Sequence, residues 1–124
     1  MSFFTAINCM DGRVQLPVIK YLQERYKVEF VDVITEPGPN RILAENSDND
    51  KLRSIFERVA ISIEKHKSKG IAIIGHHDCA GNPASEAEQK EHLDQAVEIL
   101  RQQYGNTEII GLWVDSNWEV HQVD

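Results

Sequence analysis

Short apolar runs alternate along this chain with longer segments whose apolar positions recur at helical spacing. Four of the runs share an apolar-rich composition and are predicted strands: residues 3–8, 28–35, 71–75 and 108–114. The run at 71–75, IAIIG, is apolar throughout, which is typical of a central parallel strand buried on both faces. A shorter strand, antiparallel to its neighbour, is predicted for residues 118–123 after a turn at 115–117.

Three segments between these strands are predicted helices. They share an apolar stripe of helical period and run from about Pro17 to Tyr26, from residues 48–50 to just before Gly70, and from the capping box at 85–88 to Gly105. The segment 36–40, EPGPN, is predicted to be a loop, because two prolines around a glycine do not continue a helix or a strand.

The predicted order of elements, βαβαβαββ, is typical of a parallel sheet with helices on both faces. Right-handed crossovers favour the sheet order 2-1-3-4, to which the C-terminal strand adds antiparallel. We therefore expect an α/β protein with a single three-layer domain that spans residues 1–124. In this order the chain leaves strands 1 and 3 toward opposite faces, which opens a crevice between their carboxyl ends.

Charge and composition exclude several classes of function. The formal net charge of −7 argues against a nucleic-acid partner, since phosphate binding needs clustered lysine and arginine. No apolar run approaches the roughly 20 residues that span a bilayer, and the first residues lack the features of a secretory signal. We therefore expect a cytoplasmic protein without a membrane partner. Two cysteines in such a protein favour metal binding or thiol chemistry over a structural disulfide.

Both cysteines lie in polar clusters that directly follow predicted strands. The first cluster is residues 9–13, CMDGR, and the second is residues 76–79, HHDC. Cys9, His76 and Cys79 supply two thiolates and an imidazole, a ligand set that zinc prefers, so together they predict a Zn²⁺ site in the crevice. The alternatives are two buried, unmodified cysteines with a surface histidine, or a redox pair of cysteines in a metal-free crevice.

Asp11 and Arg13 are the second chemical feature of the first cluster. Two residues apart in a segment expected to be extended, they should point to the same side and form a bidentate ion pair. Such a pair would hold the Asp11 carboxylate off the metal and leave a fourth position for water. The alternative is an ordinary surface ion pair, worth at most about 1 kcal/mol. The position beside Cys9 favours the functional interpretation.

These residues resemble the motifs of the β-class carbonic anhydrases. That family has Cys-x-Asp-x-Arg after its first strand and His-x-x-Cys after its third, with a similar order of elements. The resemblance implies that Cys9, His76 and Cys79 bind zinc, and that Asp11 and Arg13 form a gating dyad. It also implies the reaction, which is zinc-dependent, reversible hydration of a small-molecule substrate, carbon dioxide, to bicarbonate.

The sequence also departs from this family, which keeps other functions open. The family's N-terminal helical arm, which wraps a partner subunit and adds a glutamine to the pocket, has no counterpart before the first strand. In the segment 36–40, only Gly38 and Asn40 match the family pattern. One alternative is therefore a zinc-binding protein without significant turnover, and another is hydrolysis of a related small molecule, such as carbon disulfide, at the same site. A homo-oligomer stays an open alternative.

The remaining polar features receive no functional role. Three histidines are isolated in the sequence and are predicted to be solvated: His66, His92 and His121. The acidic stretch 86–98 is predicted to be the solvent-facing side of an amphipathic helix. Trp113 and Trp118 flank the last turn and are predicted to pack across the final hairpin, with a subunit contact as the alternative.

Overall fold

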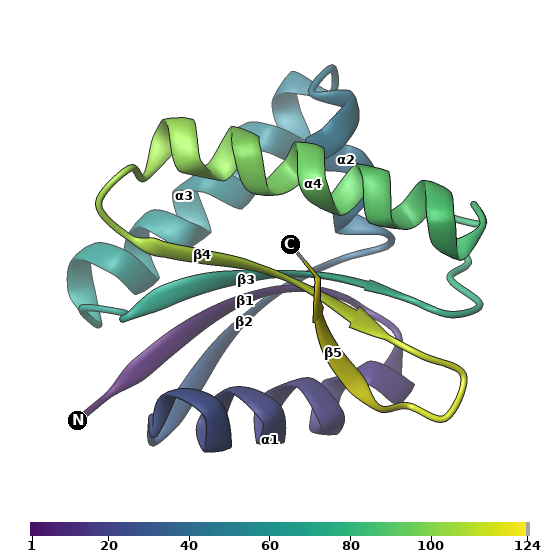
Figure 1. Cartoon of the computed structure of the whole chain (residues 1–124). Helices are drawn as coiled ribbons and strands as arrows, with labels where there is room; N and C mark the ends of the chain where they lie inside the picture. The colour runs from purple at the N-terminus through teal and green to yellow at the C-terminus, as the bar shows by residue number, and fades with distance from the viewer. Residues whose placement is uncertain (124) are drawn as a thin grey trace.

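The structure is a computed structural model that describes residues 1–123. One five-stranded sheet has the order β2-β1-β3-β4-β5, and helices cover both of its faces (Figure 1). The elements follow one another as β1 (Phe3–Cys9), a 3₁₀ turn (Gly12–Val14), α1 (Gln15–Tyr26), β2 (Phe30–Glu36), α2 (Pro39–Glu45), α3 (Asn49–Lys65), β3 (Gly70–His76), α4 (Glu86–Gln103), β4 (Glu108–Val114) and β5 (Val120–Val123).

The sheet is parallel except at one edge. β1 pairs with β2 and with β3, and β3 pairs with β4, all in parallel, whereas β5 runs antiparallel to β4. Figure 1 shows α1 on one face of the sheet and α2, α3 and α4 on the other. The predicted single α/β domain of three layers, the strand order 2-1-3-4 and the antiparallel C-terminal strand are therefore confirmed.

The apolar core lies in two layers, one on each face of the sheet. Side chains alternate along β3, so that Ala72 and Ile74 pack on the side of α1, whereas Ile71 and Ile73 pack on the side of α3 and α4. Every residue of β3 is buried, which explains its uninterrupted apolar run. The packed sheet fixes the carboxyl ends of β1 and β3 relative to each other.

The predicted loop at residues 36–40 is wrong in part, because β2 continues through Glu36 and α2 begins at Pro39. Gly38 has a φ of 62°, a left-handed conformation that glycine adopts without steric cost, and it turns the chain between the two elements. Pro39 then occupies the first position of the helix, where its missing N–H group is not needed. The Pro-Gly-Pro pattern therefore marks the start of a helix.

Local interactions shift two further boundaries. α1 begins at Gln15, before Pro17, and follows a 3₁₀ turn that the side chain of Asp11 caps. β5 begins at Val120, so Trp118 belongs to the turn between β4 and β5 rather than to the last strand. Among residues 1–123, no helix combines the length and the apolar character that crossing a membrane requires.

Candidate metal centre

The carboxyl ends of β1 and β3 bring three potential metal ligands together. Cys9 is the last residue of β1, His76 is the last residue of β3, and Cys79 lies in the loop that follows β3. All three side chains are buried, and their ligand atoms lie within 4.8 Å of one another. The crevice expected from the strand order thus contains the three residues that the sequence predicted as a metal site.

The spacing of the two sulfur atoms fits a shared metal ion better than a disulfide. Cys9 Sγ and Cys79 Sγ are 3.8 Å apart, although 70 positions separate them in the sequence. Both cysteines are free, and a disulfide bond would require an S–S distance of about 2.05 Å. Two thiolates bound to a tetrahedral zinc ion, with Zn–S bonds of about 2.3 Å, lie about 3.8 Å apart. The observed separation equals that of an S–H···S hydrogen bond between the two thiols, and it also matches the spacing of two sulfur ligands on one ion.

The ring of His76 is oriented with one nitrogen available for a metal. Its Nδ1 lies 2.8 Å from the carbonyl oxygen of His77, and because a carbonyl can only accept, Nδ1 carries the proton. The other ring nitrogen, Nε2, is buried and has no hydrogen-bond partner among residues 1–123. A buried lone pair without a partner costs free energy unless a ligand occupies it. The second ring nitrogen of a metal-binding histidine is typically fixed in this way.

The surroundings of the two thiols shift their pKa values in opposite directions. The hydrogen bond from Cys79 lowers the pKa of Cys9 to about 4, against the opposing effect of burial. The same contact, together with burial, raises the pKa of Cys79. Burial disfavours a charge on His76, but Cys9, the backbone of His77 and the Asp11 carboxylate together outweigh this effect and raise the pKa of His76. At neutral pH the metal-free site therefore holds one thiolate and one thiol.

The apparent zinc affinity is expected to fall about tenfold for each pH unit below neutral, because zinc must displace the proton of the Cys79 thiol. Cys9, with a pKa of about 4, is already a thiolate and releases no further proton. The slope should steepen at pH values where His76 is protonated, because zinc must then displace a second proton, and the raised pKa of His76 moves this point to higher pH. Competition with a chromophoric chelator from pH 8 to pH 5 measures this slope. An affinity that does not change with pH would contradict binding through these thiols.

Two glycines allow the loops after β2 and β3 to touch beside the cluster. A Cβ atom on Gly38 would lie 2.7 Å from the carbonyl carbon of Gly81, which is closer than side chains tolerate. The backbone amide of Gly38 also stabilises the Cys9 thiolate, and the backbone amide of Gly81 acts on Cys79 in the same way. The close approach of the two loops thus places backbone donors around both sulfur atoms.

A buried amide, Gln89 of α4, holds the segments that carry His76 and Cys79. Its Oε1 accepts hydrogen bonds from the backbone N–H of His76 at 3.3 Å and from Asn40 Nδ2 at 3.2 Å. Its Nε2 donates to the carbonyl oxygens of His76 at 2.9 Å and Asn82 at 3.1 Å. These four bonds use the full capacity of a side-chain amide. Gln89 therefore fixes the backbone on both sides of His76 and in the loop that contains Cys79.

Asp11 and Arg13 form the expected bidentate pair, but for a different reason than the sequence suggested. Arg13 Nη2 lies 2.7 Å from Asp11 Oδ2, and Arg13 Nε donates to Asp11 Oδ1 at 3.1 Å. The segment is not extended, because Asp11 caps the 3₁₀ turn and accepts from the backbone N–H of Arg13 at 2.9 Å. The hydrogen bonds from Arg13 lower the pKa of Asp11 to about 2, so the carboxylate is ionised at neutral pH.

Sequence reasoning missed two glutamines beside the cluster, and one of them carried a signal. Gln15 Nε2 donates to the carbonyl oxygens of Cys9 at 2.6 Å and Asp11 at 3.1 Å, which holds the loop of the first cluster. Gln89 lies in the stretch 86–98 that was predicted to face solvent, yet it is only 1% exposed. It stands four positions before Leu93 on the apolar stripe of α4, and this spacing predicts burial.

Of the three histidines predicted to be solvated, His66 and His121 are exposed and His92 is half-buried, and each has a polar partner. His66 Nδ1 lies 2.6 Å from Asp32 Oδ2, His92 Nδ1 lies 2.9 Å from Asn82 Nδ2, and His121 Nε2 lies 2.7 Å from Asp115 Oδ2. Within residues 1–123, the ligand-type atoms of Asp115, Glu119 and His121 form a second group within 4.8 Å. Asp115 also accepts two hydrogen bonds from the backbone of the turn, so this group stabilises the β4–β5 hairpin.

Several solved carbonic anhydrase structures share this architecture. Carbonic anhydrase from Glaciozyma antarctica matches with a TM-score of 0.64 and 15% identity, over 98% of this chain and 81% of that chain. A structure from a study of two tetrameric β-carbonic anhydrases of Sordaria macrospora matches with a TM-score of 0.64 and 12% identity. The match covers 97% of this chain and 79% of that chain. The β-carbonic anhydrase CafA of Aspergillus fumigatus matches with a TM-score of 0.61 and 16% identity. The match covers 98% of this chain and 74% of that chain. At these identities the likeness establishes the fold.

Family membership is established by the sequence itself. No curated protein matches the chain. The family model described as "Putative carbonic anhydrase", however, matches residues 1–124, which is the whole chain. The chain therefore belongs to this carbonic anhydrase family.

Proposed function

We propose that this chain is a zinc-dependent carbonic anhydrase that hydrates carbon dioxide reversibly to bicarbonate. In this proposal Cys9, His76 and Cys79 bind Zn²⁺ within one domain of residues 1–124, and Asp11 and Arg13 act beside the metal. Membership of the family supports the reaction, and the buried group of two cysteines and one histidine supports the metal. The Sordaria macrospora enzymes are described as tetrameric, which supports a homo-oligomer as part of the proposal.

The observation that carries this proposal is the convergence of three buried ligand atoms on one point. Two sulfur atoms lie 3.8 Å apart, and the buried Nε2 of His76 has no hydrogen-bond partner among residues 1–123. Three separate constraints hold these atoms: the parallel sheet, the Gln89 amide and the hydrogen bond from His76 to the His77 carbonyl. Such a preorganised, buried set of soft ligands is the kind of site that zinc prefers.

The residues around the metal position have distinct roles in the proposed reaction. When bound, zinc would supply a Lewis acid that lowers the pKa of water and so makes a hydroxide nucleophile available. With a pKa of about 2, Asp11 is too weak a base to remove a proton at neutral pH. We therefore assign it an orienting role, in which its carboxylate accepts a hydrogen bond from the nucleophile. Arg13 holds this carboxylate and prevents it from becoming a fourth ligand.

A second candidate function is zinc binding without significant turnover. A pocket of about 290 Å³ borders Cys79, and its lining combines the apolar Pro83, Ala84 and Trp113 with five polar side chains: His77, Asp78, Ser85, Glu86 and Gln89. Carbon dioxide is small and apolar, and a polar, charged lining suits a polar ligand better. This observation favours a metal-holding protein, or an enzyme that hydrolyses another small molecule at the same site.

Zinc-loaded protein is expected to hydrate carbon dioxide faster than buffer, with a rate that rises from pH 7 to pH 9. Two thiolates donate more charge to a metal than two imidazoles do, so the nucleophile should form only toward alkaline pH. Stopped-flow measurements on protein with a measured zinc content test this, with zinc-stripped protein as the control. One bound zinc without a rate above buffer would leave the second candidate, and the absence of bound zinc would exclude both.

A further inference from the structure

Two residues adopt left-handed backbone conformations that helix ends do not explain. Among residues 1–123, the non-glycine residues with a positive φ include Lys27, Asn46 and Lys67, which lie within two positions of a helix end. The other two are Asp78, with a φ of 58°, and Trp118, with a φ of 62°. A bulky side chain such as that of tryptophan rarely adopts this conformation unless the surrounding structure holds it there.

Both residues contact the same side chain, that of Arg13. The Trp118 ring lies against the guanidinium, with 4.6 Å between Arg13 Cζ and the ring centroid. Asp78 Oδ2 accepts a hydrogen bond from Arg13 Nη1 at 3.3 Å, and the Asp78 carbonyl oxygen accepts one from Arg13 Nη2 at 3.1 Å. The two left-handed positions therefore converge on the arginine that binds Asp11.

Arg13 needs these additional contacts because its side chain is 45% exposed. An ion pair between exposed side chains contributes little by itself, since water and salt screen it. Here Asp11 binds one edge of the guanidinium, Asp78 binds an outer nitrogen, and Trp118 covers a face. A planar group that is held at its edge and on its face must break several contacts before it can rotate.

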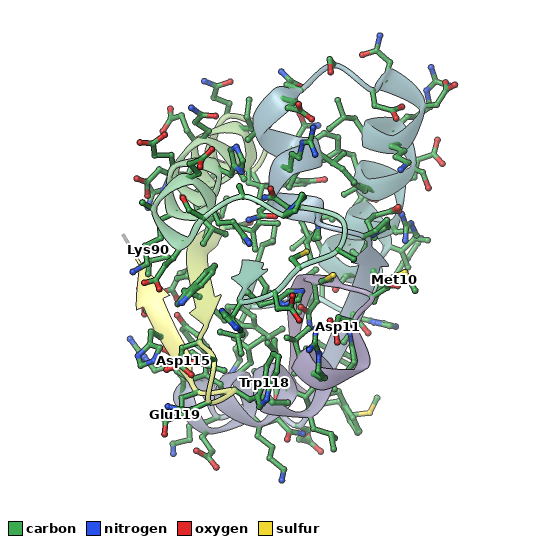
Figure 2. The ribbon with its side chains drawn as sticks, turned by 90° about the vertical axis from the view of Figure 1, so that its right-hand side faces the viewer. Met10, Asp11, Lys90, Asp115, Trp118 and Glu119 are labelled. Carbon is green, nitrogen blue, oxygen red and sulfur yellow. The ribbon has the colours of Figure 1, made fainter. Side chains whose placement is uncertain are left out.

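The turn between β4 and β5 fixes Trp118 in this place. The backbone N–H of Trp118 donates to the Asp115 carbonyl at 2.9 Å, and Asp115 Oδ1 accepts from the N–H groups of Asn117 and Glu119. The other carboxylate oxygen of Asp115 lies 2.7 Å from His121 Nε2. Figure 2 shows this turn, with Trp118, Asp115 and Glu119, on the side of the molecule where the loop with Asp11 lies.

We propose that Trp118 and Asp78 are positioning residues for Arg13. They hold its guanidinium on Asp11 and so keep the Asp11 carboxylate away from the metal position. Without them, Arg13 moves into solvent, and the Asp11 carboxylate, a group whose oxygen atoms can bind zinc, is free to occupy the position that a small substrate needs. The functional consequence rests on the proposed metal site, whereas the contacts themselves do not.

The first experiment measures the NMR order parameter of the Arg13 Nε–Hε bond vector by ¹⁵N relaxation in the metal-free protein. We expect an order parameter of about 0.85 in the wild type and below about 0.6 in Trp118→Asn. Asparagine tolerates the left-handed conformation, so this variant removes the ring without straining the turn. Trp118→Phe keeps an aromatic face, so its Arg13 order parameter should equal that of the wild type. Arg58, whose Nε donates to the Ser54 carbonyl, is the internal control.

Loss of order in Trp118→Asn together with its retention in Trp118→Phe supports the positioning role. An Arg13 bond that stays rigid in Trp118→Asn overturns it. Should Trp118→Asn unfold at the temperature of the measurement, Asp78→Asn provides the second test, since it removes one carboxylate and keeps a residue that tolerates the backbone conformation. Arg13 order equal to that of the wild type in Asp78→Asn would then overturn the role.

The second experiment probes the metal position with azide in Co²⁺-loaded protein, followed by visible absorption. Trp118→Asn should bind azide at least about 10-fold more weakly than the wild type and Trp118→Phe, because a carboxylate at the position competes with the anion. Equal azide affinities in the three proteins would overturn the functional consequence. If the wild type binds no Co²⁺, the proposed metal site fails, whereas the Arg13 measurement, made without metal, still decides the positioning role.

Discussion

Replacing Cys79 with serine is expected to weaken zinc binding by more than about 100-fold, because even the loss of outer contacts around a metal site costs about 10- to 100-fold. A serine hydroxyl stays protonated at neutral pH and is a weaker and harder donor than a thiolate. Cys79 is buried beside Cys9, so the change removes one of two adjacent sulfur ligands. The remaining cysteine and histidine cannot supply the three ligands of the proposed site.

Zinc titration against a competing chelator measures this loss, and thermal unfolding with and without zinc reports it independently. At 100 times its Kd, zinc should stabilise the wild type by about 2.7 kcal/mol and the Cys79→Ser variant by almost nothing. Met10→Leu is the matched control, because it removes a sulfur atom from an exposed side chain next to Cys9 and should leave zinc binding unchanged. Wild-type zinc affinity in Cys79→Ser would exclude Cys79 as a ligand.

Replacing Gln89 with leucine is expected to lower the free energy of unfolding by about 3–5 kcal/mol, since each buried polar group that loses its partner costs about 1–3 kcal/mol. The affected groups are the N–H and carbonyl of His76, the carbonyl of Asn82 and the amide of Asn40. Because Gln89 also fixes the backbone that carries His76, zinc affinity should fall by about 10- to 100-fold.

Chemical denaturation of the metal-free protein measures the first effect of Gln89→Leu, and zinc titration measures the second. Gln95→Leu is the matched control, because it makes the same change at an exposed position of the same helix. We expect Gln95→Leu to change the stability by less than about 0.5 kcal/mol and to leave zinc binding intact. If the two variants behaved alike, the four hydrogen bonds of Gln89 would not be the cause.

The sheet and the approach of the two cysteines could be predicted because they depend on patterns within short segments. The apolar runs that became β1 and β3 identify central strands, and right-handed crossovers leave few ways to order them. Once β1 lies beside β3, residues at their carboxyl ends must share one edge of the sheet. The meeting of Cys9 with His76 and Cys79 therefore followed from topology alone.

The helix α2 was missed because two rules for proline point in opposite directions. Proline inside a helix breaks it, whereas proline at the first helical position favours it. The choice depends on the φ of 62° at Gly38, and this turn is set by the contact of Gly38 with the Gly81 loop. Such a contact between distant segments leaves no local trace in the sequence.

Polar contacts between distant segments could likewise not be predicted from local sequence patterns. The pair of Asp11 and Arg13 was expected from its spacing, but the 3₁₀ turn that produces it was not. The contact of Trp118 with Arg13 joins the last turn of the chain to the first loop, and it exists only because the sheet brings both to one edge. Gln89 could have been recognised as buried, but its partners could not.

The placement of the cluster between β1 and β3 has a kinetic consequence. These strands lie at the centre of the sheet, and each is also hydrogen-bonded to an outer neighbour. Cys9 and His76 are the last residues of these strands, whereas Cys79 lies in the loop after β3. A metal ion bound to all three would keep two ligands on the most protected part of the sheet when that loop opens locally. The half-life of metal release into an excess of chelator would then be longer than the lifetime of local loop opening.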